Sequence, residues 1–145
     1  MSPVTYADTS IVAAYYCPEP LSDRAESALM AVKAVGISSL TEVELASAVG
    51  RKVRDRELGE PDAVRILNRF HLHVSKGMYQ RLPLDTVHYE TARDWLSRFT
   101  IVSRALDALH LAVAFQHEAA LLTADVRQAE AARRIGMKVD LVAAG

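Results

Sequence analysis

Four carboxylates stand where acidic side chains of an α/β protein could do chemistry. Asp8 and Asp125 each directly follow a short apolar run that is typical of a buried strand. Glu44 falls in the first turn of an expected helix, and Asp107 lies inside a strongly apolar one. Because open parallel sheets bind ligands beyond the carboxyl ends of their strands, all four are expected at that edge.

A shared divalent cation would relieve the repulsion among four converging carboxylates. Oxygen ligands without cysteine suit Mg2+ or Mn2+ rather than zinc. Such an ion generates hydroxide from bound water and neutralises charge that develops on a phosphate. The four acids therefore predict metal-dependent phosphodiester hydrolysis without a protein nucleophile.

Helix capping is the alternative interpretation for three of these acids. Asp8 and Asp125 stand where N-caps are expected, and a cap contributes about 1 kcal/mol. Glu44 would complete a capping box with Thr41, three residues before it. Each residue taken alone leaves both interpretations open, and their shared edge favours the metal site.

Asp107 needs a partner, because an unpaired charge buried in an apolar helix is costly. Arg104, one turn earlier, is the alternative to a metal. His110 follows Asp107 by three residues on the same face of the helix. It could hydrogen-bond near a metal, and packing in the core is its alternative role.

The elements that must position these acids alternate between short strands and longer helices. Strands are expected at residues 4–7, 35–38, 79–84, 120–123 and 138–142. Helices are expected at 10–17, from 22, at 41–57, after 61, from 85 or 86 to 99, at 103–115 and at 126–135, before Gly136. This order predicts an α/β fold with a mostly parallel central sheet of about four to five strands and helices on both faces.

Size and composition fit one globular domain that spans residues 1–145. The net charge of −1 lacks the basic excess of many nucleic-acid-binding proteins, but a negative metal pocket would leave a mildly positive remainder. Cys17 is the sole cysteine, which excludes an internal disulfide and fits a reducing cytosol. Neither a signal peptide nor a membrane-spanning run is expected, so the predicted location is cytoplasmic.

Four motifs in this chain resemble those of the PIN-domain family, and specifically of its VapC-type toxins. Residues 6–10 resemble the first acidic motif, and residues 38–45 resemble the second, in which the acid directly precedes a leucine. Residues 106–112 resemble the third motif, and residues 122–125 resemble the fourth. The order of the motifs is kept along nearly the whole chain.

The second motif contains two acids, of which Glu44 directly precedes Leu45. The resemblance therefore selects Glu44 rather than Glu42. One departure is Ala124, where family members often carry a larger or polar residue. It affects no expected ligand.

The resemblance implies a PIN-like fold and a toxin that uses Mg2+ or Mn2+ to cleave RNA, often tRNA or ribosomal RNA. Asp8 and Asp107 would be the principal metal ligands, and Asp125 would complete the cage or hold a second ion. Glu44 would bind through water or orient the attacking water. Neighbouring hydroxyls would support the ligands or contact phosphate: Thr9, Ser10 and Thr123. Family members are usually homodimers, and a cognate antitoxin inserts a segment into the active-site groove.

The densest basic stretch contains Arg51, Lys52 and Arg54, which could contact the RNA backbone. A solvated helix end, where cations suit the helix dipole, is the alternative. A catalytically silent PIN-like binding module is the alternative function, and the presence of all four acids counts against it. An aspartyl phosphatase is disfavoured, because Ser10 stands two residues after Asp8, where that chemistry needs a second acid.

Overall fold

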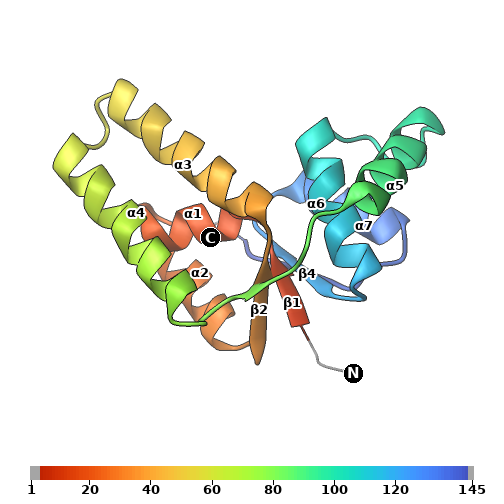
Figure 1. Cartoon of the computed structure of the whole chain (residues 1–145), viewed down its shortest axis with the longest axis horizontal. Coiled ribbons are helices and arrows are strands. Elements are labelled where there is room, and N and C mark those ends of the chain that lie inside the picture. Colours follow the sequence, from red (N-terminus) through yellow and green to blue (C-terminus); the bar gives the residue numbers. More distant parts are fainter. Residues whose placement is uncertain (1–3, 144–145) are drawn as a thin grey trace.

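The computed structural model describes residues 4–143 of the chain (Figure 1). Its elements in chain order are β1 (Val4–Ala7), α1 (Thr9–Tyr16), α2 (Ser22–Met30), β2 (Ala34–Ile37), α3 (Ser39–Arg54), α4 (Glu60–Ser75), β3 (Gln80–Arg81), α5 (Thr86–Ser97), α6 (Ala105–Gln116), β4 (Ala120–Thr123), α7 (Val126–Arg134) and β5 (Val139–Leu141). Every strand and helix expected from the sequence is present, and the differences lie at their ends.

The strands form one parallel sheet in the order β3-β2-β1-β4-β5. The central strand β1 aligns Tyr6 with Gly36 of β2 and with Leu121 of β4. Because all five strands run the same way, their carboxyl ends meet at one edge of the sheet. The predicted α/β fold with a parallel sheet is confirmed.

Alternate residues of the central strand face different groups of helices, because successive side chains of a strand point to opposite faces. Tyr6 is buried with Leu121 in a core that α5, α6 and α7 complete. Ala7 is buried with Ile37 against α1, α3 and α4. The two groups of helices form separate lobes on either side of the sheet (Figure 1).

The start of α3 differs from the expectation in a way that matters for the site. Ser38 is the N-cap, and its backbone N–H donates to Thr41 Oγ1 at 3.2 Å as part of a capping box. The helix therefore begins two residues earlier than expected, and the predicted capping box between Thr41 and Glu44 is wrong. Glu44 lies in the second turn, where its carboxylate caps nothing.

The edge strand β3 is shorter than expected. Leu82 N–H donates one further bond to β2, but Pro83 has no N–H and ends the ladder. Gly36 allows the close approach here, since a Cβ at this position would lie 2.8 Å from Val4 Cγ1 and 3.2 Å from Leu82 Cδ1.

The helices of the described residues include none with the length and apolarity that crossing a membrane requires. The longest, α3 and α4, have 16 residues each. Gly136 follows α7 with φ of 81°, the left-handed conformation that commonly ends a helix, as expected from the sequence.

Candidate active site

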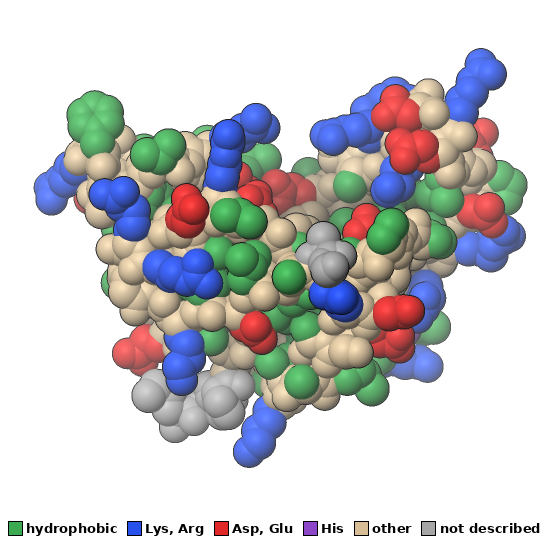
Figure 2. Space-filling model, turned by 180° about the vertical axis from the view of Figure 1, so that it is seen from behind, with side chains coloured by type: hydrophobic (Ala, Val, Ile, Leu, Met, Phe, Trp, Pro, Cys, Tyr) green, Lys and Arg blue, Asp and Glu red, His purple; other side chains and the backbone are tan. Residues whose placement is uncertain are grey.

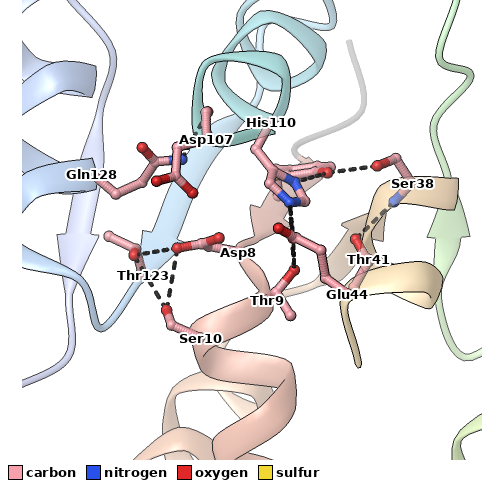
Figure 3. Close-up of polar contacts among 11 residues, drawn as sticks. Asp8, Thr9, Ser10, Ser38, Thr41, Glu44, Asp107, His110, Thr123 and Gln128 are labelled. Atoms are coloured by element: carbon pink, nitrogen blue, oxygen red, sulfur yellow. Dashed lines mark hydrogen bonds and ion pairs between the residues drawn. The ribbon is translucent and has the colours of Figure 1, made fainter. Parts of the chain in front are cut away.

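Asp8 lies at the carboxyl end of β1, where its backbone N–H continues the sheet by donating to the carbonyl of Leu122 at 2.9 Å. The residue is only 5% exposed. Its Oδ2 accepts hydrogen bonds from Thr123 Oγ1 at 2.7 Å and Ser10 Oγ at 3.2 Å (Figure 3). It occupies the N-cap position of α1, but its side chain makes no capping bond, so capping does not explain this acid.

Two backbone groups fix the direction of these hydroxyls. Ala124 N–H donates to Ser10 Oγ and Asp125 N–H donates to Thr123 Oγ1, each at 3.0 Å. Each hydroxyl therefore accepts from the backbone and uses its own proton to bind Asp8. Both bonds go to Oδ2, and no donor within residues 4–143 binds the other oxygen, Oδ1.

Burial raises the pKa of Asp8, because the charged form loses hydration. The charge of His110 and the hydrogen bonds from Thr123 and Ser10 oppose this effect, and the charge of Glu44 adds to it. The result is a buried carboxylate whose pKa stays above its usual range.

Glu44 points from α3 toward the same edge and shares a hydrogen-bond network with His110 (Figure 3). Its Oε1 accepts from Thr9 Oγ1 at 2.6 Å and binds His110 Nε2. The other ring nitrogen, His110 Nδ1, lies 2.6 Å from the Tyr6 hydroxyl, which lies 2.7 Å from Ser38 Oγ. The network therefore ties β1, the start of α3 and α6 together.

The two partners of this network shift each other toward their charged forms. Burial by itself lowers the pKa of His110, but the hydrogen bond to Glu44 and the nearby negative charges outweigh it and raise the pKa. Burial by itself raises the pKa of Glu44, but the hydrogen bond and charge of His110 and the bond from Thr9 lower it. Both shifts favour an ion pair of Glu44 and His110, and a protonated His110 would donate from both ring nitrogens.

Asp107 lies in the first turn of α6, where no cationic side chain of the described residues pairs with its carboxylate. Burial raises its pKa first, followed by the charges of Asp8, Glu44 and Asp125, while His110 opposes them. The alternative ion pair with Arg104 does not form, and no Lys or Arg among the described residues pairs with Asp107.

Gln128 fixes the backbone of Asp107, because its buried Nε2 donates to the Asp107 carbonyl at 3.0 Å. This bond joins the start of α6 to α7. Asp125 caps α7 as the alternative interpretation expected, since its Oδ1 accepts from Arg127 N–H at 2.9 Å and from Gln128 N–H at 3.4 Å. Asp125 Oδ2 accepts neither of these capping hydrogen bonds.

The structure separates the two acids of the second motif. Glu42 Oε2 lies 2.7 Å from Arg81 of β3 in an ion pair, whereas Glu44 faces Asp8 and His110. Geometry thus agrees with the residue that the leucine alignment selected. The basic residues expected to contact RNA lie in the last turn of α3, and Arg51 is seven residues, or about 10 Å along the helix, beyond Glu44.

The chemistry of the site fits a hard divalent cation. Asp8 and Asp107 offer oxygen ligands, and their raised pKa values mark a concentration of negative charge that a cation would relieve. Between residues 4 and 143, however, no three Asp, Glu, His or Cys side chains lie closely enough together to hold an ion. Mg2+ keeps several waters and is commonly bound through one or two carboxylates. The arrangement therefore fits a hydrated ion on Asp8 and Asp107 better than a closed cage of four acids.

Sequence reasoning missed several residues of the site. It left the role of His110 open between packing and a bond near the site, and the side chain is both buried and bonded to Glu44. Tyr6, Ser38 and Gln128 were not singled out. A tyrosine inside a buried strand was the available clue, because its hydroxyl needs a partner.

The fold and the site together define an α/β protein with carboxylates gathered at the carboxyl edge of a parallel sheet. The family model for the PIN domain matches residues 5–134, which is most of the sequence. This chain belongs to the PIN-domain family. Among curated proteins, none matches it.

Solved structures with a similar fold include one described as a toxin–antitoxin complex from Klebsiella pneumoniae, which is 18% identical with a TM-score of 0.64 over 88% of this chain and 89% of that chain. FitAcB from Neisseria gonorrhoeae is 21% identical, with 93% of this chain and 95% of that chain covered and a TM-score of 0.64. DNA-bound VapBC from Salmonella typhimurium is 19% identical, with 99% and 100% covered and a TM-score of 0.64. VapC20 from Mycobacterium tuberculosis, described as a sarcin-ricin loop cleaving toxin, is 19% identical, with 78% and 82% covered and a TM-score of 0.60. At these identities the likeness establishes the shared fold.

Proposed function

We propose that this protein is a divalent-metal-dependent endoribonuclease that hydrolyses RNA phosphodiester bonds and serves as the toxin of a toxin–antitoxin pair. One observation carries the proposal. Asp8 and Asp107 face the same edge of the sheet as carboxylates that no Lys or Arg of the described residues neutralises. Membership of the PIN-domain family supports the same assignment.

Asp8 and Asp107 would hold a hydrated Mg2+ or Mn2+, and Asp125 would contribute its free oxygen directly or through water. The bound ion would supply hydroxide at neutral pH and stabilise charge on the phosphate. Ser10 and Thr123 orient Asp8 and favour its ionised form by donating to its Oδ2.

Glu44 has a different task, because His110 and Thr9 both bind its Oε1. Its Oε2 can accept a hydrogen bond from a water molecule and orient that water toward the scissile phosphate. An ion-paired carboxylate is a weak base, so Glu44 is proposed to position the water rather than to remove its proton.

The proposed partners follow from the similar structures. VapC20 is described as cleaving the sarcin-ricin loop, which supports structured RNA as the substrate class. A similar structure from Klebsiella pneumoniae is described as a toxin–antitoxin complex, which supports a cognate antitoxin that covers the groove. A homodimer is proposed from the family resemblance.

A catalytically silent binding module is the second candidate. It is favoured by one observation, the lack of a closed metal cluster among the described side chains. A silent domain would have no reason to keep Asp107 charged and uncompensated beside three other acids.

The test is cleavage of total cellular RNA by the purified chain, freed of any co-purifying partner, in EDTA, Mg2+ or Mn2+. Asp8→Asn and Asp107→Asn are the active-site variants, and Asp140→Asn is the control at an exposed acid of β5. We expect discrete cleavage that requires metal and both aspartates. Cleavage that persists in EDTA or in both active-site variants would refute the proposal. Absence of cleavage by folded, metal-binding protein would favour the silent module.

A further inference from the structure

A groove beside the four acids carries positive charge that the proposed chemistry does not use. It has a volume of about 970 Å3, and Asp107 and Asp125 line it. Four arginines also line it: Arg104, Arg127, Arg133 and Arg134. Figure 2 shows acidic side chains in the hollow between the two lobes, with Lys or Arg side chains standing on both sides of it.

Two of the arginines form a stripe along α7. Arg127 and Arg134 are seven residues apart, so they lie on the same face of the helix, about 10 Å apart along its axis. Both are exposed. Arg104 adds a third cation from the N-cap of α6, next to Asp107.

Helix stability does not account for Arg127. It is the second residue of α7, where the positive end of the helix dipole disfavours a cation. None of the four arginines pairs with a carboxylate anywhere in the described residues. An unpaired cation in an unfavourable place indicates that its charge serves a ligand.

The balance of charge points to a polyanion as that ligand. The lining contains four arginines against three carboxylates, Asp107, Asp125 and Glu130. A divalent ion on the two aspartates would leave Glu130 as the sole uncompensated acid of this lining. A phosphate chain whose scissile group reaches the metal would then continue along the arginines.

We infer that the groove, which begins between the starts of α6 and α7 and continues along α7, is the track for the RNA backbone, with Arg104, Arg127 and Arg134 contacting phosphates that flank the scissile one. This inference rests on the proposed ribonuclease function and locates its substrate. It differs from the possibility raised by the sequence, in which Arg51, Lys52 and Arg54 on α3 could make these contacts.

The test measures binding of a labelled mixed-sequence hairpin RNA in EDTA, where nothing is cleaved and repulsion from the carboxylates is common to all variants. The double variant Arg127→Gln/Arg134→Gln is compared with Lys33→Gln/Lys138→Gln. The latter removes the same charge just before β2 and β5, from residues that do not line this groove. Arg51→Gln/Arg54→Gln tests the competing α3 surface. Circular dichroism checks that each variant folds.

We expect the α7 variant to lose RNA affinity roughly tenfold and to lower the slope of log K against log salt by about 1.4, at about 0.7 for each lost phosphate contact. The opposite-edge variant should bind like the wild type. Wild-type binding by the α7 variant, or a loss confined to the α3 variant, would overturn the inference. Displacement of RNA by polyglutamate at equal charge would also overturn it, in favour of an acidic protein partner. RNA binding that depends on the α7 arginines, without metal-dependent cleavage, would refute the proposed nuclease activity but support the proposed RNA track.

Discussion

Replacing Asp107 by asparagine should make the metal-free protein more stable while abolishing its activity. Burial and the charges of Asp8, Glu44 and Asp125 raise the pKa of Asp107, so its ionised form destabilises the folded state at neutral pH. Asparagine keeps the size of the side chain and removes the charge. After discounting for solvent screening at this half-buried position, the expected gain is about 1 kcal/mol, or about 3 °C in melting temperature.

In the presence of metal, the wild type should become more stable than Asp107→Asn. Preferential binding to the folded wild type stabilises it by about 2.7 kcal/mol when the ion is at a hundredfold its dissociation constant. The variant loses a ligand and should gain much less. Thermal unfolding is measured in EDTA and in a titration with Mg2+ or Mn2+, with Asp140→Asn as the control that removes an exposed acid.

Two results would refute this reasoning. A lower melting temperature of Asp107→Asn in EDTA would mean that the carboxylate has a stabilising partner in the folded state. An unchanged response of the variant to metal would mean that Asp107 is not a ligand. Lowering the pH from neutral toward the ordinary pKa of aspartate should also stabilise the wild type relative to the variant, because the folded state takes up the proton first.

Three further predictions follow from the same contacts. Glu44→Gln should lower the cleavage rate by at least tenfold, whereas Glu42→Gln should leave the rate near that of the wild type. Glu42→Gln should also lower the free energy of unfolding in urea by less than about 1 kcal/mol, since it breaks only a partly exposed ion pair. Equal cleavage rates of the two variants would contradict the assignment of Glu44. The His110–Glu44 pair should stabilise the fold at pH values below the raised pKa of His110 and above the lowered pKa of Glu44. Outside that pH window, the melting temperatures of His110→Gln and of the wild type should converge. A difference in melting temperature that stays constant from acid to alkaline pH would argue against the ion pair. Gly36→Ala should cost about 1–3 kcal/mol in urea unfolding, because its Cβ would clash with Val4, and a neutral substitution would show that β2 can shift.

The sequence by itself determined the fold class and the places of the four acids. Short apolar runs that end at Asp8 and Asp125 define strand ends, and parallel strands bring their carboxyl ends together, so local pattern was enough for these two. Asp107 was found because a carboxylate in an apolar helix demands an explanation. For Glu44 only the alternative capping box was wrong, because Ser38 and Thr41 form the cap instead.

Only the tertiary structure decided which side chains interact with one another across the site. Glu44 and His110 are 66 residues apart, and Tyr6 and His110 are 104 apart, so no local spacing could pair them. The groove arginines were equally hidden, because the sequence shows where charge is dense along the chain and not which face of the fold it lines. Strand and helix patterns depend on neighbours in sequence, whereas pKa shifts and ligand grooves depend on distances that packing alone sets.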